Sequence, residues 1–389
     1  MDKHKMTSSQ KKDKDLFSGD PGVSSRTRLK EQIEAIEKEI RETPYHKGTE
    51  HHIGMLKSKL ARLRDQQISP GGKGTGGGGL GFMVKKSGDA TCLLFGPPSV
   101  GKSSLLNTVS NANSKVGAYD FTTLKVIPGM MSYRGAKIQI LDVPGIIELA
   151  FEGKGGGKQI LSTARTADLI LIIVDKKRLD WADKVVNQLY EVGIRLNSKP
   201  KKIQIIKTMR GSIDVIDPFG SFDKELIVKM ANDFSLKNAR IFIGEKIENI
   251  DEIIDAFSAN RSYINSLFVI NKADELTRKD REKIEKKFKD NFVVVSAKDG
   301  ENISKLKKMI WQKLQFIRVY MKETKQTQPD YAEPLIMKQG DTLKDLVNTL
   351  PGEWEAQFGY VWGKKAKFPG QKINLRYEIE DEDEIYLEK

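Results

Sequence analysis

The sequence predicts an α/β fold: a doubly wound parallel sheet of the phosphate-loop type, with smaller modules attached. Short apolar runs alternate with stretches of helical periodicity, which is typical of strands buried on both faces of a parallel sheet. One gap in this alternation is too wide for a single helix and predicts an inserted small α/β domain. The core strands are expected at Thr91–Phe95, Lys137–Leu141, Leu169–Val174, Leu267–Ile270 and Phe292–Val295.

A helical hairpin is expected ahead of the sheet. Apolar residues recur every three or four positions from Leu29 to Ile40 and again from Ile53 to Leu63. Pro44 separates the two runs, because proline disfavours helix in the residue before it. The outer faces are basic, and two interpretations stay open: a plain packing hairpin, or an arm that binds RNA or a partner.

The remaining modules follow from changes in composition and periodicity. The insert should contain strands and helices of its own, and the last module should be a compact mixed sheet with one main helix. The expected boundaries are a disordered tail at 1–23, the hairpin at 24–70, a glycine-rich linker at 71–87, the sheet domain at 88–196 and 265–321, the insert at 197–264, a polar linker at 322–330 and the C-terminal module at 331–389.

Composition narrows the class of protein. The chain has 389 residues, with 66 Lys and Arg against 53 Asp and Glu, and a formal charge of +13. A basic surplus of this size favours polyanions such as RNA as partners. The single cysteine, Cys92, lies in an apolar run and fits a reducing compartment. No apolar run is long enough to span a bilayer, so we expect a cytoplasmic protein without membrane attachment.

The strongest motif is a phosphate loop. It follows the first expected strand and precedes a helix, which is the context that this motif requires. Its glycines let backbone N–H groups face phosphate oxygens, the lysine should reach the β- and γ-phosphates, and the first serine should hold Mg²⁺. The candidate residues are Gly96, Pro97, Pro98, Ser99, Val100, Gly101, Lys102, Ser103 and Ser104.

Two further elements are expected at the γ-phosphate. Asp142 ends a strand and is placed to hold a water on Mg²⁺, while Gly145 can present its N–H to the γ-phosphate. Between this run and the phosphate loop lie Phe121, Thr122 and Thr123. We expect Thr123 to bind Mg²⁺ and to release it after hydrolysis, with Thr122 as the competitor. Lys102, Thr123 and Gly145 are therefore the catalytic candidates.

Base recognition is expected from two loops that follow the last core strands. In Asn271-Lys272-Ala273-Asp274, the carboxylate of Asp274 can accept hydrogen bonds from guanine N1–H and the 2-amino group, which adenine does not offer. This motif predicts GTP and GDP as ligands rather than ATP. Ser296, Ala297 and Lys298 should close the site around the base.

The chain lacks the glutamine that orients the attacking water in many GTPases. A Ras-type GTPase has Gln immediately after the Asp-x-x-Gly run to orient the attacking water, whereas this chain has Ile146. Hydrolysis should therefore be slow unless another group, a monovalent cation or a partner assists it.

Together these residues resemble the Obg-related GTPases and, among them, the developmentally regulated GTP-binding proteins. The similarity covers nearly the whole chain. Besides the GTPase motifs it includes 119–124, 135–139, 142–148, 164–166, 193–197 and 360–363.

The resemblance implies a C-terminal TGS domain of β-grasp type, a role around ribosomes and RNA, and pairing with a dedicated regulatory protein. It leaves activation by K⁺ open, because potassium-stimulated relatives often have Asn where this chain has Ser99. We expect a monomer that does not bind DNA. Two functions remain in competition: a GTP-hydrolysing switch in translation, and a non-enzymatic scaffold whose bound nucleotide is mainly structural.

Overall fold

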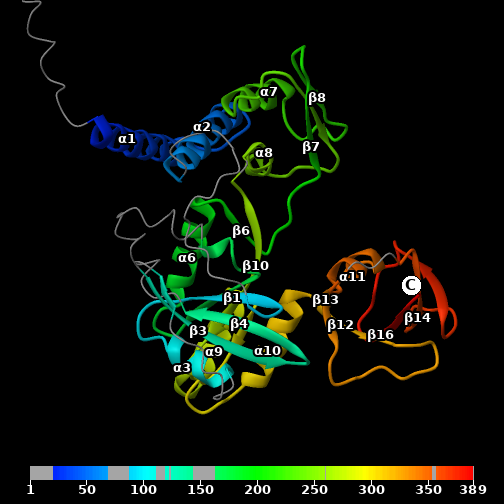
Figure 1. Cartoon of the computed structure of the whole chain (residues 1–389). Helices are drawn as coiled ribbons and strands as arrows, with labels where there is room; N and C mark the ends of the chain where they lie inside the picture. The colour runs from blue at the N-terminus through cyan, green and yellow to red at the C-terminus, as the bar shows by residue number, and fades with distance from the viewer. Residues whose placement is uncertain are drawn as a thin grey trace, which may run out of the picture. The chain divides into compact units, whose positions relative to one another are not determined.

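The computed structural model describes residues 21–68, 87–110, 119–121, 124–142, 163–258, 260–352 and 356–388. The chain divides into two compact units, each assembled from separate stretches of sequence (Figure 1). The first contains Met1–Thr75 and Pro200–Arg261, and the second contains Gly76–Lys199 and Ser262–Lys389. The expected glycine-rich linker lies almost wholly outside the described residues.

The first unit begins with the expected hairpin, formed by α1 (Pro21–Glu42) and α2 (Glu50–Ile68). Its inner stripe buries Ile33, Ile36, Leu60 and Leu63. The helix begins at Pro21, so residues 21–23 are helical and do not belong to the tail expected at 1–23. Proline suits the first turn of a helix because its missing N–H would have no intrahelical partner there.

The insert in this unit is a three-stranded sheet covered on one face by two helices. The strands have the order β7-β9-β8, with β9 antiparallel to β7 and parallel to β8. The helices bury a shared apolar core against the inner face of the sheet. The elements are β7 (Ile203–Lys207), β8 (Ile213–Ile216), α7 (Lys224–Asp233), β9 (Ala239–Ile243) and α8 (Ile250–Phe257).

Helix α2 packs against the insert, although the sequence analysis predicts the hairpin and the insert as separate modules. Met55 and Ala61 contact the core of the insert, and a Cβ on Gly54 would lie 3.3 Å from the side chain of Leu226. Lys57 Nζ lies 2.9 Å from Asp251 Oδ2. The hairpin is therefore a structural part of the insert, as its packing interpretation requires.

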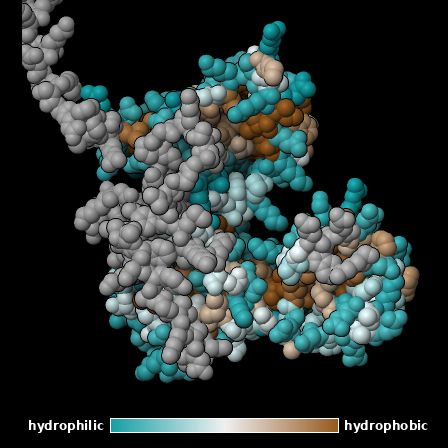
Figure 2. All heavy atoms as spheres, in the orientation of Figure 1, coloured by the Kyte–Doolittle hydropathy of each residue, from teal (hydrophilic) through white to brown (hydrophobic). Residues whose placement is uncertain are grey.

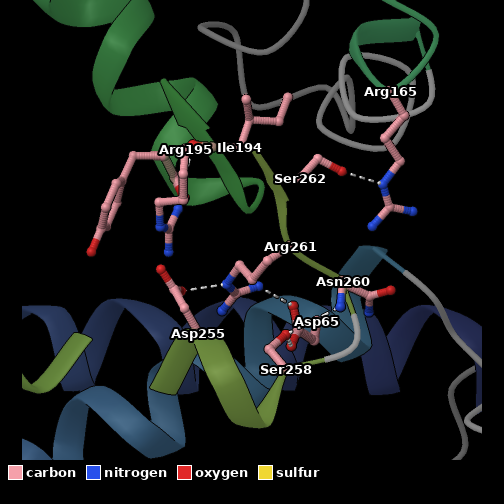
Figure 3. A network of polar contacts seen from close by, with 10 residues as sticks. Asp65, Arg165, Ile194, Arg195, Asp255, Ser258, Asn260, Arg261 and Ser262 are labelled. Carbon is pink, nitrogen blue, oxygen red and sulfur yellow. Dashed lines mark hydrogen bonds and ion pairs between the residues drawn. The ribbon is translucent and has the colours of Figure 1, made fainter. Parts of the chain in front are cut away.

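A buried arginine ties α2 to the end of the insert (Figure 3). Arg261 donates from Nε to Asp255 Oδ1 at 2.6 Å and from Nη1 to Asp65 Oδ1 at 3.0 Å. Ser258 Oγ donates to the other oxygen of Asp65 at 2.6 Å. The guanidinium side chain is only 8% exposed, so each carboxylate offsets the cost of burying its charge.

The second unit is built on an eight-stranded sheet of order β11-β10-β5-β1-β4-β3-β2, with β6 paired to β10. All the expected core strands are present, and β3 runs antiparallel to β4. The strands are β1 (Ala90–Phe95), β2 (Tyr119–Phe121), β3 (Leu124–Tyr133), β4 (Ala136–Asp142), β5 (Leu169–Val174), β6 (Ile194–Leu196), β10 (Ser262–Ile270) and β11 (Phe292–Val294).

Helices flank this sheet, and the core lies between them and the strands. Strand β10 starts at Ser262 because its first residues pair with β6. The insert therefore ends at Arg261, earlier than the boundary expected at 264. The helices are α3 (Lys102–Val109), α6 (Leu179–Glu191), the short η1 (Ala273–Glu275), α9 (Arg278–Phe288) and α10 (Ile303–Leu314).

The C-terminal module is a five-stranded sheet of order β13-β12-β16-β14-β15 with one helix. Its first strand, β12, was expected to belong to the sheet domain at 265–321. It pairs instead with β13 and β16, and buries Ile317 and Val319 in the C-terminal core. The elements are β12 (Phe316–Met321), β13 (Leu335–Lys338), α11 (Leu343–Thr349), β14 (Phe358–Trp362), β15 (Gln371–Asn374) and β16 (Asp383–Leu387).

The stretch at 322–330 is consequently a loop inside the C-terminal module and not a linker ahead of it. Lys322 N continues the sheet by donating to Ile385 O at 2.8 Å. Within the described part of the chain, no helix is long and apolar enough to cross a membrane.

Candidate nucleotide-binding site

The phosphate loop joins the end of β1 to the start of α3, at the carboxyl edge of the parallel strands. Ligands of open α/β sheets bind at this edge. Gly101 has a φ of 89°, in the left-handed region that favours glycine. A Cβ there would lie 2.4 Å from Asn271 Nδ2, and one on Gly96 would lie 2.6 Å from Ile173 O. The loop therefore requires glycine at both positions.

Lys102 spans the loop. Its Nζ donates to Gly96 O at 2.8 Å and to Pro97 O at 3.1 Å. These two carbonyls hold the ammonium group beside the backbone that would surround phosphate oxygens. A lysine in this position can exchange carbonyl contacts for phosphate contacts while its charge stays inside the loop.

Asp142 ends β4 beside the phosphate loop. Its Oδ2 accepts a hydrogen bond from Ser103 Oγ at 3.2 Å, and the residue is 2% exposed. Burial raises the pKa of this carboxyl group, while the charge of Lys102 and the Ser103 hydrogen bond act in the opposite direction. Its Oδ1 is buried without a hydrogen-bond partner among the described residues.

The oxygen atoms of this pair suit a hard divalent cation. Mg²⁺ prefers carboxylate, hydroxyl and water oxygens. A carboxylate with an unpaired oxygen, beside the serine hydroxyl of a phosphate loop, fits that preference. The other residues expected at the metal and the γ-phosphate, Thr122, Thr123 and Gly145, lie outside the described residues, as does Ile146. Phe121 is the last residue of β2.

Asn271 connects three loops of the site. It follows β10 and is 3% exposed. Its Nδ2 donates to Val100 O in the phosphate loop at 2.8 Å, and its Oδ1 accepts from Ala297 N at 3.0 Å. One buried amide thus joins the phosphate loop to the loop after β11. No local feature of the sequence specifies this connection.

The loops expected at the base lie side by side. Asp274 Oδ1 accepts from Ser296 Oγ at 3.0 Å, and Asp274 remains exposed. Lys272 has a φ of 64°, and its Nζ lies 3.1 Å from Ser99 O. Lys298 is exposed and shows no hydrogen bond or ion pair to any other residue that the structure describes. Ser104 lies exposed in the first turn of α3.

Sequence reasoning missed three residues that shape these loops. Asp175, 4% exposed, lies 3.3 Å from Lys272 Nζ through its Oδ2. Arg178 contacts the carbonyl of Pro98, and Thr108 Oγ1 donates to Ala297 O at 2.9 Å. Asp175 could have been predicted from the sequence, because it directly follows the apolar run of β5. That strand lies between β1 and β10 in the sheet.

Family profiles match across this domain. The profile described as "50S ribosome-binding GTPase" matches residues 91–209, and the one described as "C-terminal region of MMR_HSR1 domain" matches residues 210–316. Among solved structures, a GTP-binding protein of Pyrococcus horikoshii OT3 aligns with 77% of this chain and 99% of its own length. Its TM-score is 0.41 at 14% sequence identity.

Two curated relatives are similar over nearly their full length. An uncharacterized GTP-binding protein of Methanocaldococcus jannaschii is 46% identical over 91% of each chain. The Developmentally-regulated GTP-binding protein 2 homolog of Dictyostelium discoideum is 39% identical over 92% of this chain and 99% of its own. With this site, these profiles and these relatives, the chain belongs to the developmentally regulated GTP-binding proteins, a family of GTPases that bind guanine nucleotides.

Proposed function

We propose that this GTPase is a cytoplasmic switch that acts on ribosomes and RNA during translation. The observation that carries the proposal is the charge of +13, far more than a nucleotide site requires. The matching family profile, that of a 50S ribosome-binding GTPase, agrees with it. We further propose that the chain acts as a monomer, with a dedicated regulatory protein, and without binding DNA or membranes.

The basic residues of α2 are fewer than the sequence suggests, because two are paired within the unit. Lys57 pairs with Asp251, and Arg64 Nη2 lies 2.8 Å from Glu37 Oε1. Lys59 and Arg62 are exposed. They remain as candidates for phosphate contacts.

The basic stretch of the C-terminal module is reduced in the same way. Lys364 lies 3.3 Å from Glu382, and Lys365 is paired with Glu380. Lys367 is exposed, and no ion pair joins it to another described residue. Exposed pairs contribute little to stability, so an RNA phosphate can compete with these glutamates for the lysines.

At the nucleotide, we assign Lys102 to the β- and γ-phosphates and Asp274 to the guanine edge. Ser103 and Thr123 would hold Mg²⁺, which when bound neutralises charge on the phosphates. Gly145 would sense the γ-phosphate through its N–H. Because Ile146 offers no group to orient water, slow intrinsic hydrolysis and acceleration by a partner or by K⁺ are part of the proposal.

The first experiment tests the ribosome. Co-sedimentation should be measured over a salt series in GTP and GDP, with Lys59→Gln/Arg62→Gln against the control pair Lys305→Gln/Lys308→Gln on α10. Loss of two phosphate contacts should reduce the slope of log affinity against log salt by about two. Equal slopes for both pairs, or no ribosome binding by the parent chain, would overturn the assignment of α2.

The second experiment separates the switch from a scaffold with a mainly structural nucleotide. Single-turnover hydrolysis should be followed with and without ribosomes, and with K⁺ in place of Na⁺. A switch predicts acceleration by ribosomes, a large loss in Lys102→Ala and a small one in Ile146→Ala. An unchanged rate with ribosomes favours the scaffold, and an unchanged rate with K⁺ removes the cation from the proposal.

A further inference from the structure

The outer face of the C-terminal sheet carries a row of aromatic rings. Alternate residues of a strand share one face, so Phe358, Tyr360 and Trp362 of β14 project together, away from the buried Val361. Tyr386 of β16 lies opposite Tyr360. The centroids of Phe358 and Tyr360 are 6.0 Å apart, and those of Tyr360 and Tyr386 are 6.1 Å apart. These rings are partly exposed.

A lysine ammonium group lies over each ring of β14. Lys372 Nζ is 3.4 Å from the centroid of Phe358, Lys325 Nζ is 3.6 Å from that of Tyr360, and Lys322 Nζ is 4.5 Å from that of Trp362. These lysines come from β15 and from the loop after β12. Three cations are therefore held over three rings by segments that meet only in the folded module.

The three lysines differ in how firmly they are held. The side chain of Lys322 is 7% exposed and lies 3.2 Å from Glu384, so it is a fixed part of the face. Lys325 is 38% exposed and lies 3.9 Å from Glu388. Lys372 is exposed and forms no ion pair with the residues that the structure describes. Lys325 and Lys372 can move off their rings without leaving a buried charge behind.

This chemistry fits single-stranded RNA better than a protein. A base stacks on a planar ring, and a lysine displaced from that ring can contact the adjacent phosphate. The outer face of the insert provides the contrast: its exposed residues include Ile206, Ile216 and Phe242, and no lysine lies over Phe242 within the described chain. Aliphatic side chains offer no planar surface for a base.

We propose that the outer face of the C-terminal sheet binds unpaired bases of single-stranded RNA by stacking on Phe358, Tyr360 and Tyr386. Lys325 and Lys372 exchange their ring contacts for phosphate contacts when the bases bind. The inference rests on the proposed action on RNA and adds the chemical class that this face recognises: exposed bases rather than duplex. Tyr360 is the central residue, and its hydroxyl is fixed by Glu388 Oε2 at 3.0 Å.

The test uses the full chain and a fluorescently labelled oligouridine of about ten nucleotides, with binding followed by anisotropy. Tyr360→Leu should weaken binding roughly 5- to 150-fold, the range for losing one base–ring stack. Tyr360→Phe keeps the ring and should bind like the parent. Phe242→Leu, which removes a partly exposed ring from the other sheet, should also bind like the parent. Equal affinity of Tyr360→Leu and the parent would overturn the proposal.

An abasic oligomer of the same length separates stacking from charge. The abasic chain should bind weakly, and Tyr360→Leu should weaken it no further. If the variant loses as much affinity for the abasic chain as for oligouridine, its defect is not stacking and the proposal fails. Lys372→Gln should reduce the slope of log affinity against log salt for oligouridine by about 0.7, the value for one phosphate contact on a single strand. An unchanged thermal unfolding profile of the full chain verifies that the C-terminal module of each variant is folded.

Ribosome co-sedimentation of the same variants distinguishes this inference from the function on which it rests. A parent chain that binds ribosomes but not oligouridine refutes the stacking face and leaves the proposed function standing. A parent chain that binds neither refutes both. A Tyr360→Leu variant that loses ribosomes while keeping oligouridine would show that the face binds protein, and would also overturn the inference.

Discussion

The nucleotide-binding loops and the outer face of the C-terminal sheet hold their polar groups in opposite ways. In the loops, a few buried groups each join several segments: Asn271 alone bonds to the loops that contain Val100 and Ala297. On the sheet, the strands fix the positions of the rings, and the ammonium groups of Lys325 and Lys372 each lie over one ring. One change should therefore have a large, shared effect in the loops and a small, local effect on the sheet.

The outer face of the insert adds a third arrangement to this comparison. It alternates with the buried face along each strand, as the C-terminal sheet does, but exposes isoleucines and the Arg240–Asp214 ion pair, with Phe242 as its one aromatic ring among the described strand positions. Figure 2 shows hydrophobic atoms gathered in the region of β7 and β8. Ile206 is 57% exposed and Met209 in the following loop is 99% exposed. The two sheets thus share a backbone pattern and differ in surface chemistry.

The largest effect is expected from Asn271→Ala. The change leaves the Val100 carbonyl and the Ala297 N–H unpaired in a buried site, which should cost about 2–5 kcal/mol in the free energy of unfolding. GTP affinity should fall with it, because both loops lose their anchor. Denaturant titration and binding of a fluorescent GTP analogue measure the two effects.

Asn265→Ala, on the strand β10 that precedes Asn271, is the matched control. Its Nδ2 makes one hydrogen bond, to Lys313 O at 2.8 Å, away from the nucleotide loops. We expect a cost of about 1 kcal/mol and unchanged GTP affinity. If the two variants bind GTP equally well, Asn271 does not organise the site.

The next effect concerns base recognition. Asp274→Asn should weaken GTP binding by about 2–4 kcal/mol, because the amide cannot accept both hydrogen bonds from guanine. Xanthine has an oxygen in place of the 2-amino group, so the variant should gain affinity for xanthosine triphosphate. Competition titrations check both changes. Glu275→Gln, an exposed neighbour on η1, should change neither, and tight GTP binding by Asp274→Asn would contradict the guanine-site assignment.

A smaller effect of opposite sign is expected from Asp142→Asn. Removing a buried carboxylate with an unpaired oxygen should stabilise the nucleotide-free protein by about 1 kcal/mol, or roughly 2–4 °C in Tm, while Mg²⁺-dependent GTP binding falls. Calorimetry of the apoprotein measures the gain in stability, and GTP titration with and without Mg²⁺ measures the loss of binding. A variant less stable than the parent would show that Asp142 has a partner beyond the described residues.

The pH dependence of that difference follows from the raised pKa of Asp142. A carboxyl group whose pKa is higher in the folded state favours folding more when it is protonated. The advantage of Asp142→Asn should therefore be largest near neutral pH. It should shrink as the pH falls through the folded-state pKa towards the ordinary value of an aspartate. An advantage that grows on acidification would mean that the sign is wrong.

The smallest effect belongs to the sheet. Lys325→Gln should change the free energy of unfolding less than any of the variants above, because an exposed cation–π contact is weak. A double-mutant cycle with Tyr360→Leu isolates the coupling between the two side chains. If the coupling free energy between Lys325 and Tyr360 were as large as the cost of Asn271→Ala, the side chains on the sheet would be as cooperative as those in the loops. The difference between the two regions would then be refuted.

The sequence by itself determined the fold class, the positions of the core strands along the chain and the family of GTPases. Strands such as β5 are apolar at every position, and the phosphate loop stands between a strand and a helix, so local pattern is sufficient there. The sequence predicted the domain boundaries less accurately. The sequence of β12 fits the end of one sheet or the start of the next equally well, because the residues of a strand do not specify which strand it pairs with.

Only the tertiary structure decided which groups meet. It attached the hairpin to the insert through Arg261 and Asp65, joined two loops through the amide of Asn271, and placed Lys372 over Phe358. It also showed that two of the four lysines and arginines of α2 that could contact RNA, Lys57 and Arg64, form ion pairs within the first unit. The physical reason is the same in each case: a hydrogen bond, an ion pair or a ring contact depends on distance and direction in space, and the partners here are separated by long stretches of chain.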